Sequence, residues 1–224
     1  MNRPRENEFI EQARGLVALA RQTAGLKGVP RTGWLDRGVD PRRVESVADH
    51  SLGVALLAWA CAVERRAQGA DLDPQRVVVL ALLHDLAEAE TGDSPPYDST
   101  ALPTADDQEG RRAFLDRRHV RTEANEAAKR AHEDAAMRRL LDALPAAVRS
   151  ETEDYWDELQ RGTSAEARFV KQADRLETFL QSRHYSSDAP MLAMDSFRRE
   201  VMETIDDPLL AAIRDAALAE EFPE

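Results

Sequence analysis

Four residues in three separate segments have the types and surroundings to hold a metal ion: His50, the adjacent pair His84 and Asp85, and Asp174. The adjacent pair lies inside the apolar run 77–88, where a buried imidazole and carboxylate are costly unless something compensates them. A divalent cation does so most economically, because two neutral imidazoles and two carboxylates satisfy its coordination and cancel its charge. A metal held in this way lowers the pKa of bound water and polarises a phosphoryl oxygen.

Two carboxylates near this pair are candidates for proton transfer. In a helix, Glu88 follows His84 by four residues, so it lies over the same face one turn further on. A carboxylate there takes a proton from the attacking water or orients it, and Asp93, beyond the predicted helix end, serves as acid or base on the leaving oxygen. Taken singly, each residue also has a structural interpretation, because a lone buried histidine is usually hydrogen-bonded in the core and a lone aspartate often caps a helix.

Three further side chains are candidates for substrate binding. Arg31 and Trp34 lie in the loop 25–41, where an arginine clamps a phosphate with a forked pair of donors and a tryptophan stacks on a nucleoside. Packing of Trp34 under the loop is the alternative. Lys171, one turn before Asp174, contacts phosphate in one interpretation and forms a surface ion pair in the other.

The remaining polar candidates carry less information. His119 and His132 lie in charged surroundings, so we expect them to face solvent; the alternative is that they hold a second metal bridged to the first. We interpret His184 as a surface residue. Glu45 and Asp49 either support a metal ligand from behind or are solvated.

The hydrophobic pattern predicts helices almost throughout the chain and no convincing strand. Ser46 is a plausible N-cap for a helix from 47 to about 68. Asp73, followed by proline, opens the helix that carries the adjacent histidine and aspartate, and this helix ends near Gly92. The stretch 163–166 resembles a capping box that starts a further helix. The other predicted helices cover 6–25, 123–143, 146–160, 190–205 and 207–220.

The composition is that of an ordinary globular protein. The chain has 224 residues, 42% hydrophobic and 32% charged, which is enough for one domain with a real core. Its net charge of −12 argues against a nucleic-acid polymer as partner, because no dense basic patch is present. The single cysteine, Cys61, excludes an internal disulfide and fits the reducing cytoplasm, where we expect the protein to work. The longest apolar run, 52–63, is too short to span a membrane, so we expect no membrane partner.

We predict a single domain over residues 1–224. Its core covers about 6–190, and a helical extension follows over about 190–224. Residues 98–122 are polar, charged and without clear periodicity, so we interpret them as an inserted, irregular or mobile loop. Because this loop follows directly on Asp93, it forms a lid or reshapes the pocket.

Taken together, several stretches resemble one known family, the HD-domain metal-dependent phosphohydrolases, and within it the small 5′-deoxynucleotidases. A His-Asp doublet alone is weak evidence, whereas the whole set, in family order over about 10–185, is specific. Family members pass quickly to an acidic helix that here resembles 128–144, so 98–122 is an insertion by comparison. The matching stretches are 26–34, 44–51, 82–88, 91–95 and 165–177.

The resemblance implies an all-α HD-domain bundle that releases inorganic phosphate from 2′-deoxyribonucleoside 5′-monophosphates and usually forms a homodimer. It implies one divalent metal ion, whose identity stays open among cobalt, manganese, magnesium, iron, zinc and nickel. The metal ligands implied are His50, His84, Asp85 and Asp174.

The same resemblance assigns roles around the metal. It implies that Glu88 and Asp93 take part in hydrolysis. It places Arg31 on the phosphate and Trp34 near the sugar, where the indole would disfavour a 2′-hydroxyl.

Other functions share parts of this pattern. A hydrolase of deoxynucleoside triphosphates, or of a nucleotide-like natural-product intermediate, would use the same ligands with a different pocket. A non-catalytic module that binds a nucleotide and regulates a partner predicts erosion of the ligand set, yet every ligand and Glu88 are present. A two-metal oxygenase of the same fold would hold two irons per chain.

Overall fold

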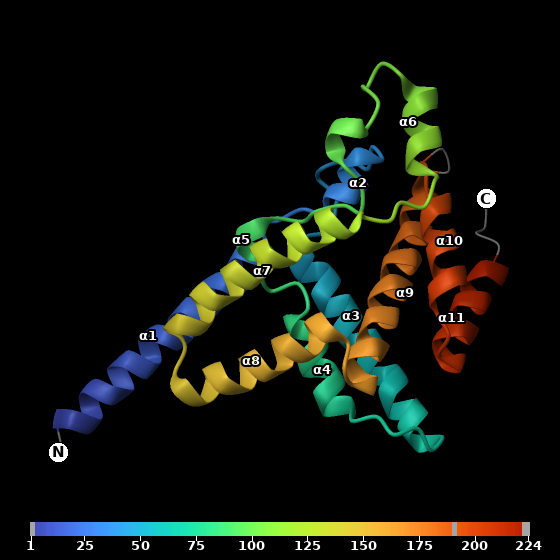
Figure 1. Cartoon of the computed structure of the whole chain (residues 1–224). Coiled ribbons are helices and arrows are strands. Elements are labelled where there is room, and N and C mark those ends of the chain that lie inside the picture. The colour runs from blue at the N-terminus through green and yellow to red at the C-terminus, as the bar shows by residue number, and fades with distance from the viewer. Residues whose placement is uncertain (1–2, 190–191, 221–224) are drawn as a thin grey trace.

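Three helices cross at the centre of the structure: α3 (Val47–Ala67), α4 (Pro74–Leu83) and α9 (Ala165–Asp188). The computed structural model describes residues 3–189 and 192–220, and within these ranges it contains helices and no strand (Figure 1). The prediction of an all-α helical bundle is confirmed. Side chains from the three helices fill the main core, among them Val54, Val77, Leu80, Leu176 and Phe179.

The other helices surround this centre in two groups. On one side, α10 (Asp195–Thr204) and α11 (Pro208–Ala219) pack on α9. On the other side, α7 (Glu123–Ala143) packs against α1, α5 and α8 around a second core. The remaining bounds are α1 (Arg3–Leu26), α2 (Thr32–Asp36), α5 (Glu88–Thr91), α6 (Gln108–Leu115) and α8 (Ala146–Arg161).

Local sequence signals explain where the central helices begin. Ser46 caps α3, and its partner in a capping box is Asp49, whose carboxylate accepts from the Ser46 backbone N–H. Asp49 is therefore a capping residue. Asp73 caps α4 with Pro74 in its first turn, as predicted. The cap of α9 is Ser164 rather than a box opening one residue earlier, because Glu166 instead accepts from the backbone of Asp73.

The predicted helix from 73 to Gly92 is interrupted at the adjacent pair, which corrects our expectation of one continuous helix. The α-helical pattern stops at Leu83, and the backbone then makes tighter bonds, including Glu88 N–H to Asp85 O at 2.9 Å. A short helix, α5, follows and ends at Gly92, which has a positive φ of 75° that glycine adopts without strain. The break means that Glu88 is placed by a turn and not by helical spacing alone.

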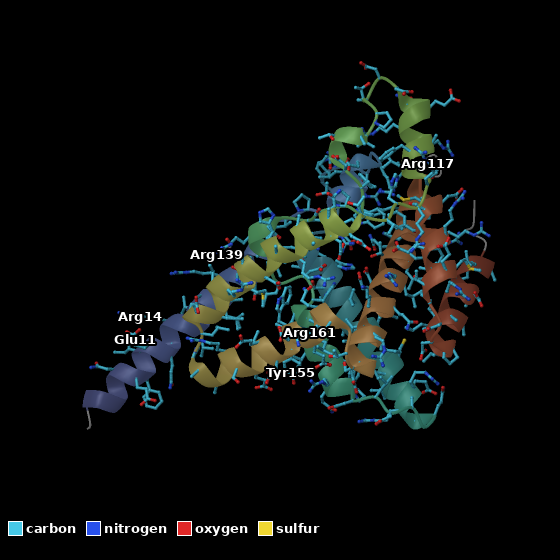
Figure 2. All side chains as sticks on the ribbon, viewed as in Figure 1. Glu11, Arg14, Arg117, Arg139, Tyr155 and Arg161 are labelled. Carbon is cyan, nitrogen blue, oxygen red and sulfur yellow. The ribbon has the colours of Figure 1, made fainter. Side chains whose placement is uncertain are left out.

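The N-terminal half of α1 extends away from the other helices (Figure 1). Its ion pair between Glu11 and Arg14 is exposed to solvent (Figure 2). The apolar side chains that the sequence groups on this helix, including Phe9 and Leu16, are also exposed. This part of the predicted core helix therefore contributes little to the core of one chain.

The insertion 98–122 is more ordered than predicted, since it contains α6 and is anchored to the last residue of α2. The Tyr97 hydroxyl donates to Asp36 Oδ2 at 2.8 Å, and the Arg111 guanidinium donates to the backbone oxygen of Asp36. Leu115, at the end of α6, is buried. The insertion is consequently packed against the rest of the fold. The interpretation of residues 98–122 as an irregular loop is therefore wrong for the part that forms α6.

Arg37 joins the insertion to the rest of the fold. It donates to the backbone oxygen of Leu115 in the insertion, and also to the backbone oxygens of Gly33 and Ala193 and to Ser196 Oγ. Replacing Arg37 with Met should reduce the free energy of unfolding by about 2 to 4 kcal/mol, since buried oxygens lose a charged donor. Urea denaturation measures that change, and amide exchange across 98–118 should speed up.

The matched control for this variant is Arg42→Met, because Arg42 makes only an exposed pair with Asp40. It should leave both measurements near the wild-type values. Unaltered exchange in the Arg37 variant would show that the insertion docks by other contacts.

Candidate metal centre and active site

His50 lies in the first turn of α3, fully buried, and faces α9. Its Nε2 is 3.0 Å from Asp174 Oδ1 and 3.8 Å from Asp85 Oδ2. Its Nδ1 donates to Glu177 Oε2 at 2.6 Å, which fixes the ring orientation and leaves Nε2 directed at the two aspartates.

Glu177 needs an unusually close approach between α3 and α9. A β-carbon at position 53 would lie 2.6 Å from Glu177 Oε1, so a larger residue there would push this carboxylate away from its place beside His50. The glycine at position 53 is therefore explained by its packing against Glu177, which the sequence alone does not reveal.

His84 and Asp85 enter the same space from the turn after α4. The Nδ1 of His84 donates to the backbone oxygen of Ala81 at 2.7 Å, so its Nε2 faces the cluster, 3.1 Å from Asp85 Oδ2. The rings of His50 and His84 have centroids 5.4 Å apart. The structure thus brings together all four residues predicted as metal ligands, from three distant segments.

The chemistry of this donor set fits a divalent cation. One ligand atom each from His50, His84 and Asp85 lie within 4.8 Å of one another. The Nε2 of His84 is buried and makes no well-aligned hydrogen bond in the described part of the chain, although Asp85 Oδ2 lies 3.1 Å away, so a cation between the two would satisfy both. Each imidazole has its other nitrogen engaged, as is usual for histidines that bind metal through Nε2.

Protonation of His84 competes with metal binding at this group of four side chains. Burial alone lowers the pKa of His84, but the adjacent Asp85 outweighs it and raises that pKa to about 10. Asp85 itself has a pKa below its usual range, because the neighbouring charges of His84, His50 and Arg31 overcome the effect of burial. A cation that binds here must displace a proton from His84, so its affinity increases with pH.

Glu88 begins α5 and is almost completely buried, with Oε2 lacking a hydrogen-bond partner among the described residues. Burial, with the nearby charges of Asp85 and Asp93, raises its pKa to about 9. The Lys129 ammonium of α7 opposes this shift from 3.6 Å, and it also pairs with Glu133. A carboxylate with so high a pKa readily holds a proton, as an acid–base group must.

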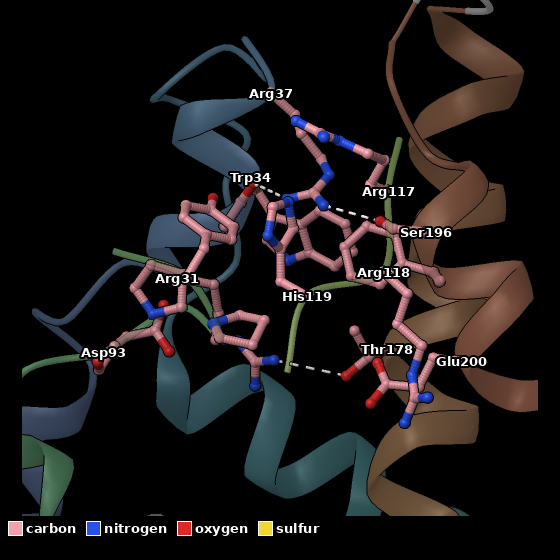
Figure 3. A pocket seen from close by; sticks show the side chains of 16 residues that line it. Arg31, Trp34, Arg37, Asp93, Arg117, Arg118, His119, Thr178, Ser196 and Glu200 are labelled. Carbon is pink, nitrogen blue, oxygen red and sulfur yellow. Dashed lines mark hydrogen bonds between the residues drawn. The ribbon is translucent and has the colours of Figure 1, made fainter. Parts of the chain in front are cut away.

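Arg31 and Asp93 line a cavity of about 120 Å³ that adjoins the cluster (Figure 3). Arg31 Nη1 is 3.9 Å from Asp85 Oδ2, and Nη2 donates to Thr178 Oγ1 of α9 at 3.4 Å. Asp93 accepts from the backbone N–H of Thr32. Arg31 therefore lies beside a residue predicted to bind metal, and Asp93 lines the same cavity as Arg31.

Trp34 combines the two interpretations that the sequence left open. It is buried, packs against Tyr185 and Phe197, and lines the same cavity. Its Nε1 donates to Glu45 Oε1 at 2.8 Å. Glu45 is thus not simply solvated, because its carboxylate accepts from the indole and holds the ring in place close to Glu177.

Several other candidates lie elsewhere. Lys171 is exposed on α9 and is not among the residues that line the cavity, so its contact with substrate stays a prediction without geometric support. His119 does not face solvent as expected; it stacks on Phe114 and Tyr97 and lines the cavity. His132 is exposed.

Neither His119 nor His132 belongs to a group of metal-ligating side chains in the described ranges. His184 is exposed, as predicted.

Sequence reasoning missed Glu177, Thr178 and Lys129. The first two follow Asp174 by about one turn of α9, so a search for partners at helical spacing from each predicted ligand would have found them. Lys129 lies on a helix of mixed charges, where nothing distinguishes it from its neighbours before the fold is known.

The chain is similar to several known proteins. The human 5′-deoxynucleotidase HDDC2 is 35% identical over 173 residues, which cover 77% of this chain and 69% of the human protein. A conserved hypothetical protein from Pyrococcus furiosus superposes with a TM-score of 0.66 at 24% identity, covering 91% of this chain and 99% of that one. For a structure described as a predicted metal-dependent phosphohydrolase from Magnetospirillum magnetotacticum, the TM-score is 0.61, the identity 22% and the coverage 93% and 91%.

The family model described as "HD domain" matches residues 23–213, which include every candidate site residue. The chain therefore belongs to the HD-domain family, in the branch that contains proteins named 5′-deoxynucleotidases.

Proposed function

We propose that the protein hydrolyses the phosphomonoester of 2′-deoxyribonucleoside 5′-monophosphates. The observation that carries this proposal is the convergence of His50, His84, Asp85 and Asp174 beside a cavity lined by Arg31. The name of the human relative supports the substrate class. The intact ligand set argues against a module that only binds a nucleotide.

The residues of the site divide the work of hydrolysis. Arg31 binds the phosphate with its forked donors, held by Thr178 on one side and Asp85 on the other. Glu88 is protonated in the metal-free site, but the positive charge of a bound divalent ion would favour its ionised form, which takes the proton from the attacking water. Asp93 serves the leaving oxygen. A divalent ion held by the four ligands, when bound, supplies positive charge that polarises the phosphoryl group and acidifies water.

Trp34 selects the sugar in this proposal. Because Glu45 accepts from its indole N–H and Tyr185 and Phe197 pack against it, the ring is held rigidly at the cavity wall. A rigid indole next to the sugar leaves no space for a 2′-hydroxyl and offers that hydroxyl no partner, so ribonucleotides bind more weakly.

A metal-by-substrate screen tests the proposal directly. The protein is stripped of metal, reloaded with one of cobalt, manganese, magnesium, iron, zinc or nickel, and assayed with dAMP, AMP and dATP. We expect orthophosphate from dAMP, less from AMP, and no triphosphate from dATP. Release of triphosphate would favour a triphosphate hydrolase, and two irons per chain by elemental analysis would favour an oxygenase.

We further propose that the protein is a cytoplasmic homodimer that uses one metal ion per chain. Leu52, Leu56, Trp59 and Val63 recur at helical spacing along α3, and their side chains are between 38% and 58% exposed. α3 is long and apolar enough to cross a membrane, but 44% of its most apolar window is buried inside the fold. A second copy of the chain would bury the rest, and this supports a dimer without a membrane partner.

We call these four apolar residues of α3 the stripe. Replacing Leu56 with Glu should convert the dimer into a monomer, because the new carboxylate would be buried in the interface without a partner. Light scattering after size-exclusion chromatography measures the mass. Glu64→Arg, exposed on the same helix but on a different face from the stripe, is the matched control and should leave the mass unchanged. A dimer that persists in the Leu56 variant would place the interface elsewhere.

A further inference from the structure

The cavity beside the metal centre contains a second arginine that the site described so far does not use. Arg118 follows α6 in the insertion and lines the same cavity as Arg31 and Asp93. Figure 3 shows its side chain directed toward Thr178 and Glu200, on the other side of Thr178 from Arg31. The insertion thus brings a second cation to the cavity, whereas Lys171, the other candidate for a phosphate contact, does not line it.

Arg118 lies at the end of the cavity that α9 borders. Its side chain is directed toward Thr178, the residue to which Arg31 donates and which follows Asp174 by about one turn of α9 (Figure 3). Arg37 and Arg117 lie at the opposite end, beside Ser196 (Figure 3). Of the cavity arginines, Arg31 and Arg118 are therefore the pair beside Thr178.

The surroundings of Arg118 hold it in place without using all of its donors. Its Nη1 forms an ion pair with Glu203 of α10, and its side chain is only 30% exposed. Its Nε is buried and has no hydrogen-bond partner in the part of the chain that the structure describes. Among the described residues the guanidinium is bonded through Nη1, so this cavity-lining residue keeps further N–H donors for an anion.

We propose that Arg118 is a second phosphate-binding residue, which grips the phosphoryl group from the side opposite Arg31. Two guanidinium groups then share the oxygens of one dianion, and the pairing with Glu203 orients the second group before the substrate arrives. The proposal rests on the proposed function only for the identity of the substrate. Binding of inorganic phosphate tests it separately.

The experiment compares Arg118→Ala and Arg118→Gln with wild type and with Arg112→Ala. Arg112 is the matched control, because it is also in the insertion but makes an exposed pair with Asp116 and does not line the cavity. Calorimetry with inorganic phosphate, on manganese-loaded protein, measures the dissociation constant. We expect it to increase roughly 10- to 100-fold in both Arg118 variants, the range for loss of a charge-assisted hydrogen bond, and less than about twofold in the control.

A parallel titration with 2′-deoxyadenosine, which has no phosphate, shows which part of the substrate Arg118 contacts. Its affinity should be the same in all four proteins. Unchanged phosphate affinity in the Arg118 variants would overturn the proposal, as would an equal loss of affinity for deoxyadenosine. The glutamine variant keeps the aliphatic stem and a polar end but loses the charged guanidinium, so it decides the matter if the alanine variant does not fold.

The outcome also separates this inference from the proposed function. Wild-type protein that binds phosphate through Arg118 but releases none from dAMP would contradict the function and leave the phosphate site standing. Turnover of dAMP with phosphate binding that does not depend on Arg118 would do the reverse.

Discussion

Asp85→Asn is expected to reduce phosphate release from dAMP by about a thousandfold or more and to remove most of the bound metal. The carboxylate lies 3.1 Å from His84 Nε2 and 3.9 Å from Arg31 Nη1, so it joins the metal ligands to the phosphate-binding arginine. Asparagine keeps the shape but removes the negative charge that compensates a divalent cation. Elemental analysis and steady-state kinetics measure the two losses.

The fold should survive this substitution, because Asp85 contributes to the site and not to the hydrophobic core. Far-ultraviolet circular dichroism should therefore show unchanged helix content. Asp71→Asn, an exposed carboxylate before α4, is the matched control and should keep both metal and activity. Full activity in the Asp85 variant would refute the metal assignment.

Glu88→Gln is expected to lower kcat by roughly 10²- to 10⁴-fold, the usual contribution of a general acid or base, while KM and metal content change little. Among the described residues no hydrogen bond or ion pair joins the Glu88 side chain to a predicted metal ligand, and its ion-pair partner is Lys129 at 3.6 Å. Glu90→Gln is the control, because Glu90 lies on the same short helix but pairs with Arg139 at the surface. A large loss of metal in the Glu88 variant would show that this residue is a ligand instead.

The same variant should change how stability depends on pH in metal-free protein. The pKa of Glu88 is raised from its ordinary value of 4.5 to about 9, chiefly by burial. The folded chain therefore holds a proton that the unfolded chain releases between these values, and its stability falls as pH rises through this window. Glutamine cannot ionise, so the Tm of Glu88→Gln relative to wild type should increase from pH 5 to pH 9.

The sequence predicted best those features that depend on short-range rules. The caps at Ser46 and Asp73 set the starts of α3 and α4 correctly, because capping is decided within four residues. The four predicted metal ligands also meet as expected, since buried polar groups in apolar helices must find one another or a cation.

Features that depend on distant contacts were harder to predict. The break at His84 leaves no sequence signal, because glycine and proline are absent there and the turn is stabilised by tertiary packing. The insertion appears polar and aperiodic, yet Arg37 and Asp36 order it from a distant loop. Likewise, Arg118 cannot be distinguished from other surface arginines until the insertion is docked.

One stretch of α9 carries Asp174, Glu177 and Thr178, which touch respectively the predicted metal site, the ring of His50 and the arginine that binds phosphate. These three residues lie on adjacent turns of one helix, so a movement of α9 would displace all three contacts together. Laboratory evolution toward new substrates should therefore accumulate its changes in 94–122, which shape the cavity from outside. Substitutions in this turn of α9 would instead disturb several contacts at once and be rejected early.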